Sequence, residues 1–207
     1  TGEVEMYWQQ ELAIYDVHVI DKKGIFLNEK EFLPHEVVYR LPPQISDAGT
    51  RVEQVRRDLE RLVRMGVNVI RLEGTGTGAE GVNCSEVRTF YSLCRKRGFL
   101  TGDLWIRPEN LPVYRGLSGE TAEDALLSAN GRTLTERYYY YQAKWSSEPV
   151  LYPVLSTLHR QENGLLSLTI YSNQKKVVLY VDGLLFLFQT AASGDPEFIF
   201  EDIPVAK

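Results

Sequence analysis

The chain has 207 residues, of which 43% are hydrophobic, and a net charge of −5. This length suits one domain or two small ones. The negative charge provides no attraction for a nucleic-acid backbone or an anionic membrane. We therefore expect no nucleic-acid partner. No window approaches the roughly 18 apolar residues of a membrane-spanning helix, so we also expect no membrane span.

The two cysteines, Cys84 and Cys94, have no CxxC spacing and no neighbouring histidine cluster. They predict buried thiols rather than a zinc site or a disulfide framework, and we expect neither a metal nor a cofactor. Residues 1–10 lack the apolar stretch of a signal peptide, although such a segment can be removed. The compartment therefore stays open, with the periplasm or secretion favoured over the cytoplasm.

The N-terminal residues predict strands and a short β-hairpin. Leu12–Tyr15 and Val17–Ile20 are rich in strand-forming side chains, and a turn signal follows at residues 21–24. Ile25–Leu27 continues the pattern, and a second break at residues 28–30 separates it from Phe32 and Leu33.

A strong amphipathic helix is predicted to begin near Thr50, which has capping-box spacing to Glu53, and to end at Gly66. Its apolar positions recur at steps of three and four residues; they are Val52, Val55, Leu59, Leu62 and Val63. The run Val67–Leu72 that follows is typical of a buried parallel strand.

A second helix is predicted from a cap at Ser85 to a stop at Gly98, and a strand begins at Phe99. Strands and helices that alternate in this way indicate a parallel α/β sheet. The next part is irregular, with a helix expected at Glu120–Ser128. Residues Arg137–Trp145 fit either a helix or a strand.

After Pro149 the pattern becomes all-β. The expected strands cover residues 151–158, 165–171, 177–181, 184–189 and 198–200. Asn163-Gly164 and Asp182-Gly183 are hairpin turn signals. This spacing predicts a small β-sandwich, with a domain boundary near residues 146–149.

Three stretches together resemble the family-2 glycoside hydrolases of the β-galactosidase type. Lys23–Phe32 (KGIFLNEKEF) is similar to the strand pair that introduces the family's barrel, with Glu29 where the family has glycine. Asp58–Arg71 (DLERLVRMGVNVIR) is similar to the first barrel helix and second strand. Arg137–Pro149 (RYYYYQAKWSSEP) is similar to the last barrel helix, and Tyr171–Asn173 and Val181–Gly183 are similar to the domain behind it.

This resemblance implies a fold class of α/β plus β, in which a partial (β/α) TIM-barrel-like segment precedes an immunoglobulin-like β-sandwich. It divides the chain into the end of a preceding β domain (residues 1–22), the barrel segment (23–148) and an incomplete sandwich (149–207). The implied activity is hydrolysis of terminal β-glycosides, with a carbohydrate as ligand. Self-association, or association with the missing remainder of a longer chain, is the other expected partnership.

The resemblance also implies substrate-binding residues at strand ends, where barrels bind ligands. Arg71 matches the family's arginine that lines the sugar pocket; a structural salt bridge is the alternative. Glu73, Asp103 and Trp105 lie at comparable strand ends, and Trp105 is suited to stack on a sugar ring or to pack in the core. The family's histidine shortly after the arginine is missing, since Glu73 is followed by Gly-Thr-Gly.

The two catalytic glutamates of a retaining glycosidase cannot be assigned in this sequence. Its one Asn-Glu pair, Asn28-Glu29, lies in the predicted introductory hairpin. A barrel takes about 30 residues per unit, and the segment between Asp103 and Arg137 has room for one unit only. We therefore expect either a subset of a longer polypeptide or a truncated relative without catalysis.

Two other functions fit parts of the sequence. Gly76–Gly81 has the spacing GxGxxG, with Asp103 about 20 residues further on, as in dinucleotide-binding folds. Glu73, Gly74 and Thr75, however, separate the motif from the preceding strand. The second alternative is a non-catalytic carbohydrate-binding or interaction module built around the C-terminal strands.

Overall fold

The computed structural model describes residues 15–20, 23–41, 48–72, 84–101, 114–115, 126–127, 133–162 and 164–204. Its contacts divide the chain into two units, Thr1–Leu33 and Pro34–Lys207. No helix in the described ranges is long and apolar enough to cross a membrane.

The first unit contains the predicted hairpin. β1 (Val17–Ile20) pairs antiparallel with β2 (Gly24–Leu27), which pairs with β3 (Lys30–Glu31). Asn28 and Glu29 form the second turn with φ angles of 50° and 65°, the left-handed conformation of a tight hairpin turn. The third strand is Lys30–Glu31 rather than Phe32–Leu33, because a two-residue turn brings the next two residues directly opposite β2.

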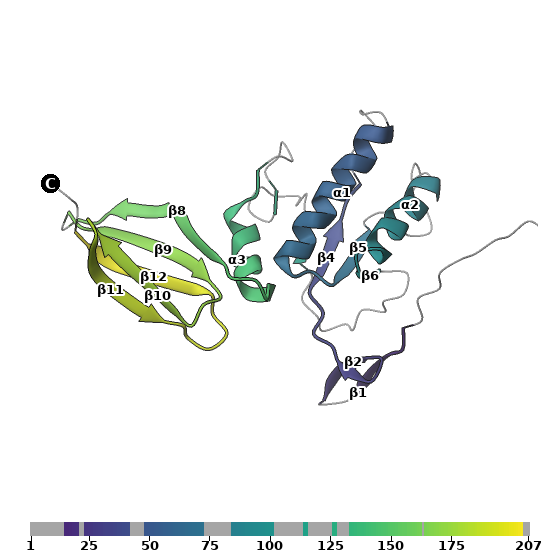
Figure 1. Cartoon of the computed structure of the whole chain (residues 1–207), viewed down its shortest axis with the longest axis horizontal. Helices are drawn as coiled ribbons and strands as arrows, with labels where there is room; N and C mark the ends of the chain where they lie inside the picture. Colours follow the sequence, from purple (N-terminus) through teal and green to yellow (C-terminus); the bar gives the residue numbers. More distant parts are fainter. Residues whose placement is uncertain are drawn as a thin grey trace, which may run out of the picture. The chain divides into compact units, whose positions relative to one another are not determined.

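The second unit begins with a parallel sheet, which confirms the predicted α/β alternation. Its strands are ordered β6-β5-β4-β7 and all pair parallel. Their bounds are Glu36–Tyr39 (β4), Val69–Leu72 (β5), Leu100–Thr101 (β6) and Tyr114–Arg115 (β7). Helix α1 (Ala48–Met65) joins β4 to β5, and α2 (Cys84–Arg95) joins β5 to β6 (Figure 1).

Both helices pack on the same face of this sheet. The Tyr39 ring of β4 stacks on Phe90 of α2 at 5.1 Å, and its hydroxyl donates to Asp58 of α1 at 3.1 Å. The predicted apolar face of α1 is mostly buried, but Val63 is exposed. Each helix residue turns by about 100°, which carries Val63 beyond the stripe that contains Leu62.

The predicted start of the first helix near Thr50 is right to within two residues, the predicted cap at Ser85 lies one residue inside α2, and the predicted ends are right. Helix α1 begins at Ala48 and α2 at Cys84, so Thr50 and Ser85 lie inside the first turns rather than at the caps. Capping-type spacings also occur inside helices, so the pattern alone does not locate the first turn. At the other ends, Gly66 and Gly98 have φ angles of 89° and 81°.

Between the sheet and the C-terminal strands lies α3 (Glu136–Trp145), capped by Thr135. Residues 137–145, for which the sequence fitted either a helix or a strand, are therefore helical. Of the helix predicted at residues 120–128, only residues 126 and 127 are described, and Leu127 instead forms a β-bridge with Leu134. Leu126 and Leu127 are both buried, and a run of apolar residues does not distinguish a helix from an extended segment.

Helix α3 packs against α1. The Tyr138 hydroxyl donates to the carbonyl oxygen of Arg61 at 2.8 Å, and Gln142 Nε2 donates to that of Arg64 at 3.4 Å. A Cβ atom on Gly66 would lie 2.5 Å from the Trp145 carbonyl oxygen. The glycine is therefore required both by its φ angle and by the approach of α3.

The C-terminal part contains the five predicted strands in two antiparallel sheets, ordered β12-β9-β8 and β10-β11. The bounds are Leu151–Arg160 (β8), Leu166–Ser172 (β9), Lys176–Val181 (β10), Leu184–Thr190 (β11) and Glu197–Ile203 (β12). The predicted turn at Asp182-Gly183 is present, with both φ angles positive. Both sheets contribute to one buried cluster, which includes Ile170, Val177, Phe198, Phe200 and Ile203.

Candidate functional site

The strand register defines a second face of the parallel sheet, opposite the helices. Glu36 pairs with Val69, and Val38 pairs with Arg71. Their chain neighbours, such as Val37 and Ile70, belong to the core against the helices. Because side chains alternate along a strand, Glu36 and Arg71 project from the opposite face.

Glu36 and Arg71 form an ion pair on this face. Arg71 Nε donates to Glu36 Oε1 at 2.9 Å, and the side chains are 40% and 4% exposed, respectively. The positive charge of the guanidinium balances the negative charge of the buried carboxylate, and the carboxylate in turn holds the arginine side chain in place. Within the described residues, the two terminal nitrogens of Arg71 have no hydrogen-bond acceptor. These nitrogens are suited to donate to a hydroxyl or carboxylate of a ligand.

Arg71 therefore lies near the carboxyl end of β5, where the sequence predicts it, and its pairing fits the salt-bridge alternative as well. The other predicted site residues, Glu73, Asp103 and Trp105, lie outside the described residues, as does the GxGxxG segment. Glu36 was not among the site residues predicted from the sequence. The signal that could have found it is a charged residue directly before the run Val37–Tyr39, two residues after Pro34.

The Asn28-Glu29 pair serves the hairpin of the first unit. Asn28 Oδ1 accepts a hydrogen bond from the Asp16 backbone N–H at 2.9 Å, and both residues of the pair form the turn. Among the residues that the structure describes, no group of three or more His, Cys, Asp or Glu side chains is arranged to hold a metal ion. Cys94 is a buried free thiol, as predicted, whereas the Cys84 side chain is outside the described part.

Asp58 is a buried acid of the core. Burial raises the pKa of its carboxyl, against the opposing effects of the Tyr39 hydrogen bond and of Arg61. Burial also raises the pKa of Tyr39, and the nearby Asp58 charge adds to the effect. Both groups lie between the sheet and the helices, where their hydrogen bond partners them with each other.

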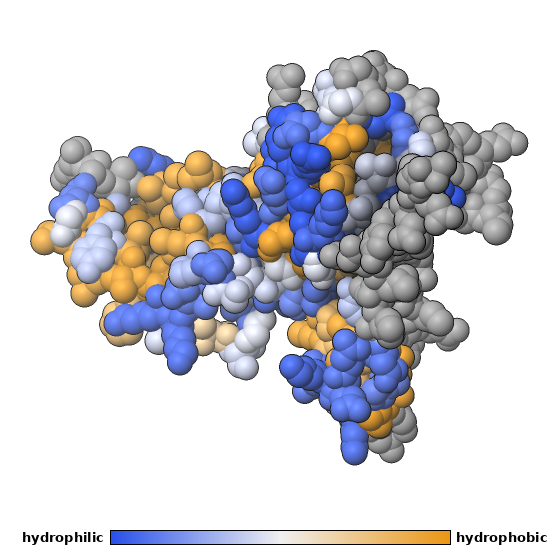
Figure 2. Space-filling view, turned by 45° about the vertical axis from the view of Figure 1, so that its right-hand side comes forward, coloured by the Kyte–Doolittle hydropathy of each residue, from blue (hydrophilic) through white to orange (hydrophobic). Residues whose placement is uncertain are grey.

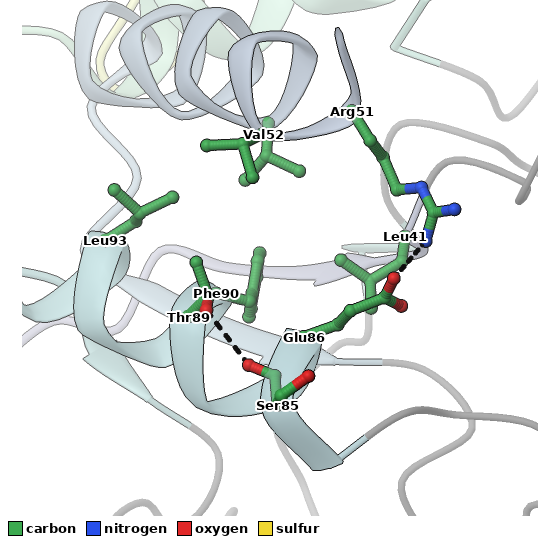
Figure 3. Close-up of a pocket in the computed structure, with 9 residues that line it drawn as sticks. Leu41, Arg51, Val52, Ser85, Glu86, Thr89, Phe90 and Leu93 are labelled. Atoms are coloured by element: carbon green, nitrogen blue, oxygen red, sulfur yellow. Dashed lines mark hydrogen bonds and ion pairs between the residues drawn. The ribbon is translucent and has the colours of Figure 1, made fainter. Parts of the chain in front are cut away.

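A cavity lies on the helix side of the sheet, between α1 and α2 (Figure 3). Its volume is about 270 Å³. The apolar part of the wall consists of Leu41, Val52, Val55, Phe90 and Leu93, and the polar part of Arg51, Ser85, Glu86 and Thr89. Arg51 Nη1 is ion-paired with Glu86 Oε1.

No family model and no curated protein matches the chain, but solved structures do. A β-glucuronidase of Bacteroides uniformis is 14% identical, with 94% of this chain and 45% of that chain covered at a TM-score of 0.64. The fold resembles that of β-glucuronidases. One from Parabacteroides merdae is 10% identical, with coverages of 89% and 46% and a TM-score of 0.60. A protein of Bacteroides fragilis described as a candidate β-galactosidase is 12% identical, with coverages of 95% and 54% and a TM-score of 0.60.

These likenesses confirm the predicted resemblance to family-2 glycoside hydrolases as a resemblance in fold. This chain, which consists mostly of β-strands with few helices, matches domains of these enzymes. The chain spans about half the length of the solved structures it matches. At these identities the comparison describes the fold, and activity is a separate question.

Proposed function

We propose that this chain is part of a family-2-type glycoside hydrolase that removes terminal β-linked sugars in the full-length protein. The observation that carries the proposal is the extent of the structural likeness, which covers 94% of the chain in the Bacteroides uniformis β-glucuronidase. The strand order and helix packing support the same proposal independently of that comparison.

In a closed (β/α)₈ barrel, the last strand pairs with the first, and the last helix packs beside the first. Here β7 pairs parallel with β4 on the side away from β5, and α3 packs on α1. We therefore interpret β4, β5 and β6 as the first strands of a TIM-barrel-like segment, and β7 with α3 as its closing unit. The units between them are not assigned to this chain.

The proposed role of Arg71 is to bind the sugar. On this interpretation its face of the sheet is the barrel interior, and its guanidinium is anchored by Glu36. Arginine binds carboxylates in a two-pronged geometry and also donates to hydroxyls. A β-glucuronide and a β-galactoside are thus both suitable substrates, and the two catalytic carboxylates of a retaining mechanism are not assigned.

For the C-terminal part we propose an immunoglobulin-like sandwich. The chain order of β8, β9 and β12 in one sheet, with β10 and β11 in the other, fits this topology. The domain limits proposed from the sequence are 23–148 and 149–207, and they remain a prediction. The contacts divide the chain at a different place, between Leu33 and Pro34.

The test uses the full-length protein, identified by its intact mass. Turnover of a p-nitrophenyl β-glucuronide or β-galactoside is expected. Arg71→Lys, which keeps the charge beside Glu36 but removes the planar fork, should lower kcat/KM by about 10- to 100-fold. Arg64→Lys, on the exposed side of α1, is the matched control. Absence of turnover of both glycosides would contradict the proposal.

A non-catalytic carbohydrate-binding module is the second candidate, and one observation favours it. Tyr139 of α3 and Tyr152 of β8 stack at 3.8 Å, with Tyr171 of β9 beyond them at 6.5 Å. Partly exposed aromatic rings of this kind suit contact with sugars. Glycan binding without turnover, lost on Tyr152→Ala, is the outcome that this alternative predicts.

A further inference from the structure

Strand β10 has a free backbone edge. It pairs with β11 on one side, and no other strand in the described part of the chain pairs with it. Ala191 N donates to Lys175 O at 3.0 Å, so the backbone groups of Lys175 and of every second residue after it point toward β11. The N–H and C=O groups of Val178 and Tyr180 therefore point the other way. The register shift places its extra residue on β11, which leaves the edge of β10 regular.

The sheet that faces β10 is bare along one strand. Ile170 of β9 belongs to the buried cluster between the two sheets, and it pairs with Pro153 of β8. Directly paired residues lie on the same face of a sheet, as do alternate residues along a strand, so Leu151 and Pro153 also project toward the side of this cluster. Both are nevertheless exposed, Leu151 by 65%. This face of β8 is thus not covered by any of the described strands.

The free edge of β10 and the bare face of β8 belong to one opening. Strand β11 lies beside β12, where Gln189 Nε2 donates to the Ile199 carbonyl oxygen, and Figure 1 shows β8 and β11 at opposite sides of this part of the chain. Because the facing sheet is ordered β12-β9-β8, β10 lies toward β9 and no described strand lies opposite β8. At this opening Leu179 and Val181 of β10 are only partly buried.

We propose that this opening binds an extended segment of another polypeptide, with apolar side chains at every second position, which adds to β10 as a further strand. The backbone of the segment pairs with the free groups of Val178 and Tyr180, as in β-strand addition. Its apolar side chains turn toward Leu151 and Pro153, and the alternate side chains face solvent. The proposal rests on strand pairing and exposure alone and does not depend on the proposed glycosidase activity.

A second copy of this chain fits the opening less well. In a pairing of two β10 edges, each β10 already packs on its own β9, through Val177 and Ile170. No strand is then left to lie over either β8. A single extended segment both pairs with the edge and covers the bare face.

The experiment measures binding of a fluorescein-labelled peptide to the whole chain by fluorescence anisotropy, at a concentration at which sedimentation velocity shows a monomer. In this peptide valine alternates with threonine between terminal lysines. The control peptide has the same composition, but its valines form one block. The alternating peptide should bind at least about tenfold more tightly, because only its valines all lie on one face of a strand and can be buried together.

Two pairs of variants test the location. Val178→Pro removes a donor of the free edge but no hydrogen bond to β11, and it should weaken binding at least about tenfold. Val178→Thr keeps the N–H and should leave binding unchanged. Leu151→Lys, on the bare face, should also weaken binding about tenfold. Its control is Leu185→Lys, a position that is 59% exposed and lies opposite Tyr180 on the outer face of β11.

Circular dichroism checks that the variants are folded. Failure of the wild-type chain to bind the alternating peptide or equal affinity for the two peptides would overturn the proposal. Binding that either Val178→Pro or Leu151→Lys leaves unchanged would overturn it as well.

Discussion

Glu29 occupies a backbone conformation that few side chains tolerate. Its φ angle is 65°, directly after Asn28 at 50°. Asparagine adopts the left-handed region at low cost, whereas other residues with a Cβ atom pay about 1 kcal/mol or more. The resemblance to family-2 hydrolases also places a glycine at this position. The turn therefore tolerates strain that one substitution would relieve.

We predict that Glu29→Gly stabilises the hairpin locally by about 0.5–1 kcal/mol, because it removes the steric cost of the positive φ. Amide hydrogen exchange of β2 and β3, which this turn connects, should slow accordingly. The control is Glu31→Gly in β3, where the backbone is extended and glycine only adds conformational freedom to the unfolded chain. Faster exchange in Glu29→Gly than in the wild type would show that the backbone at Glu29 is not strained.

At the scale of elements, the joint between α1, the start of β4 and α3 is centred on one glycine. The α1 terminus has paired hydrogen bonds, from Gly66 N to Val63 O and from Val67 N to Leu62 O, both at 3.0 Å, which is the Schellman arrangement. Helix α2 ends with the same arrangement around Gly98. The two glycines differ in their surroundings, since only Gly66 has the α3 backbone within contact of an added Cβ.

We expect Gly98→Ala to lower the free energy of unfolding by about 1 kcal/mol, the cost of a Cβ at positive φ. Gly66→Ala should cost at least about 2 kcal/mol more, because the methyl group would also push the Trp145 carbonyl and displace α3 from α1. Urea denaturation of both variants measures the difference. Equal losses would show that α3 does not constrain this position.

His35 links the same elements. Its Nδ1 lies 2.8 Å from the Gly66 carbonyl oxygen, and its ring stacks on Trp145 with the centroids 5.0 Å apart. Burial lowers the pKa of His35, although the hydrogen bond to Gly66 partly opposes this shift. The neutral ring is therefore the form that the folded joint favours.

The sign of the pH effect follows from the lowered pKa. The folded protein binds the His35 proton less tightly than the unfolded chain does, so the contribution of His35 to stability is complete above about pH 6.5, its ordinary pKa. This contribution is lost as the pH falls from there through the lower folded pKa. Thermal unfolding between pH 8 and pH 5 should show this decline, and His35→Gln should remove it. His159→Gln, an exposed position on β8, is expected to keep the wild-type profile.

At the scale of the whole molecule, the C-terminal sheets expose many large apolar side chains. Figure 2 shows them gathered over this part of the chain, and those on β10 and β11 are Val178, Tyr180, Leu184, Leu185, Leu187 and Phe188. Among the described strands, β10 pairs only with β11. Exposed apolar strands with an open edge favour association with another chain.

We therefore predict that this chain self-associates as its concentration rises. Leu184→Lys combined with Tyr180→Lys should reduce the association, because exposed lysines on an edge strand oppose pairing. Both side chains are more than half exposed, so the melting temperature should change little. Val63→Lys on α1 is the control, and sedimentation velocity is the measurement. Association that persists unchanged in the double variant would exclude this surface.

Local patterns in the sequence determined most of the elements and several of their ends. The glycines at positions 66 and 98 located the ends of α1 and α2, and Asp182-Gly183 located a hairpin, because a positive φ angle is a requirement of single residues. Alternation and β-branched content located the C-terminal strands. The helix starts were placed too late, because a Thr or Ser at capping spacing also fits inside a first turn.

Tertiary structure decided what local patterns left open. Residues 137–145 became helical because Tyr138 and Tyr141 pack into the core against α1, a contact between residues more than 70 positions apart. The partner of Arg71 is Glu36, and only the parallel register of β4 and β5 brings the two together. The sequence by itself named the arginine and the family that it resembles. The burial of the Glu36 carboxylate, the pairing of β7 with β4 and the packing of α3 on α1 depend on long-range contacts, which no local pattern encodes.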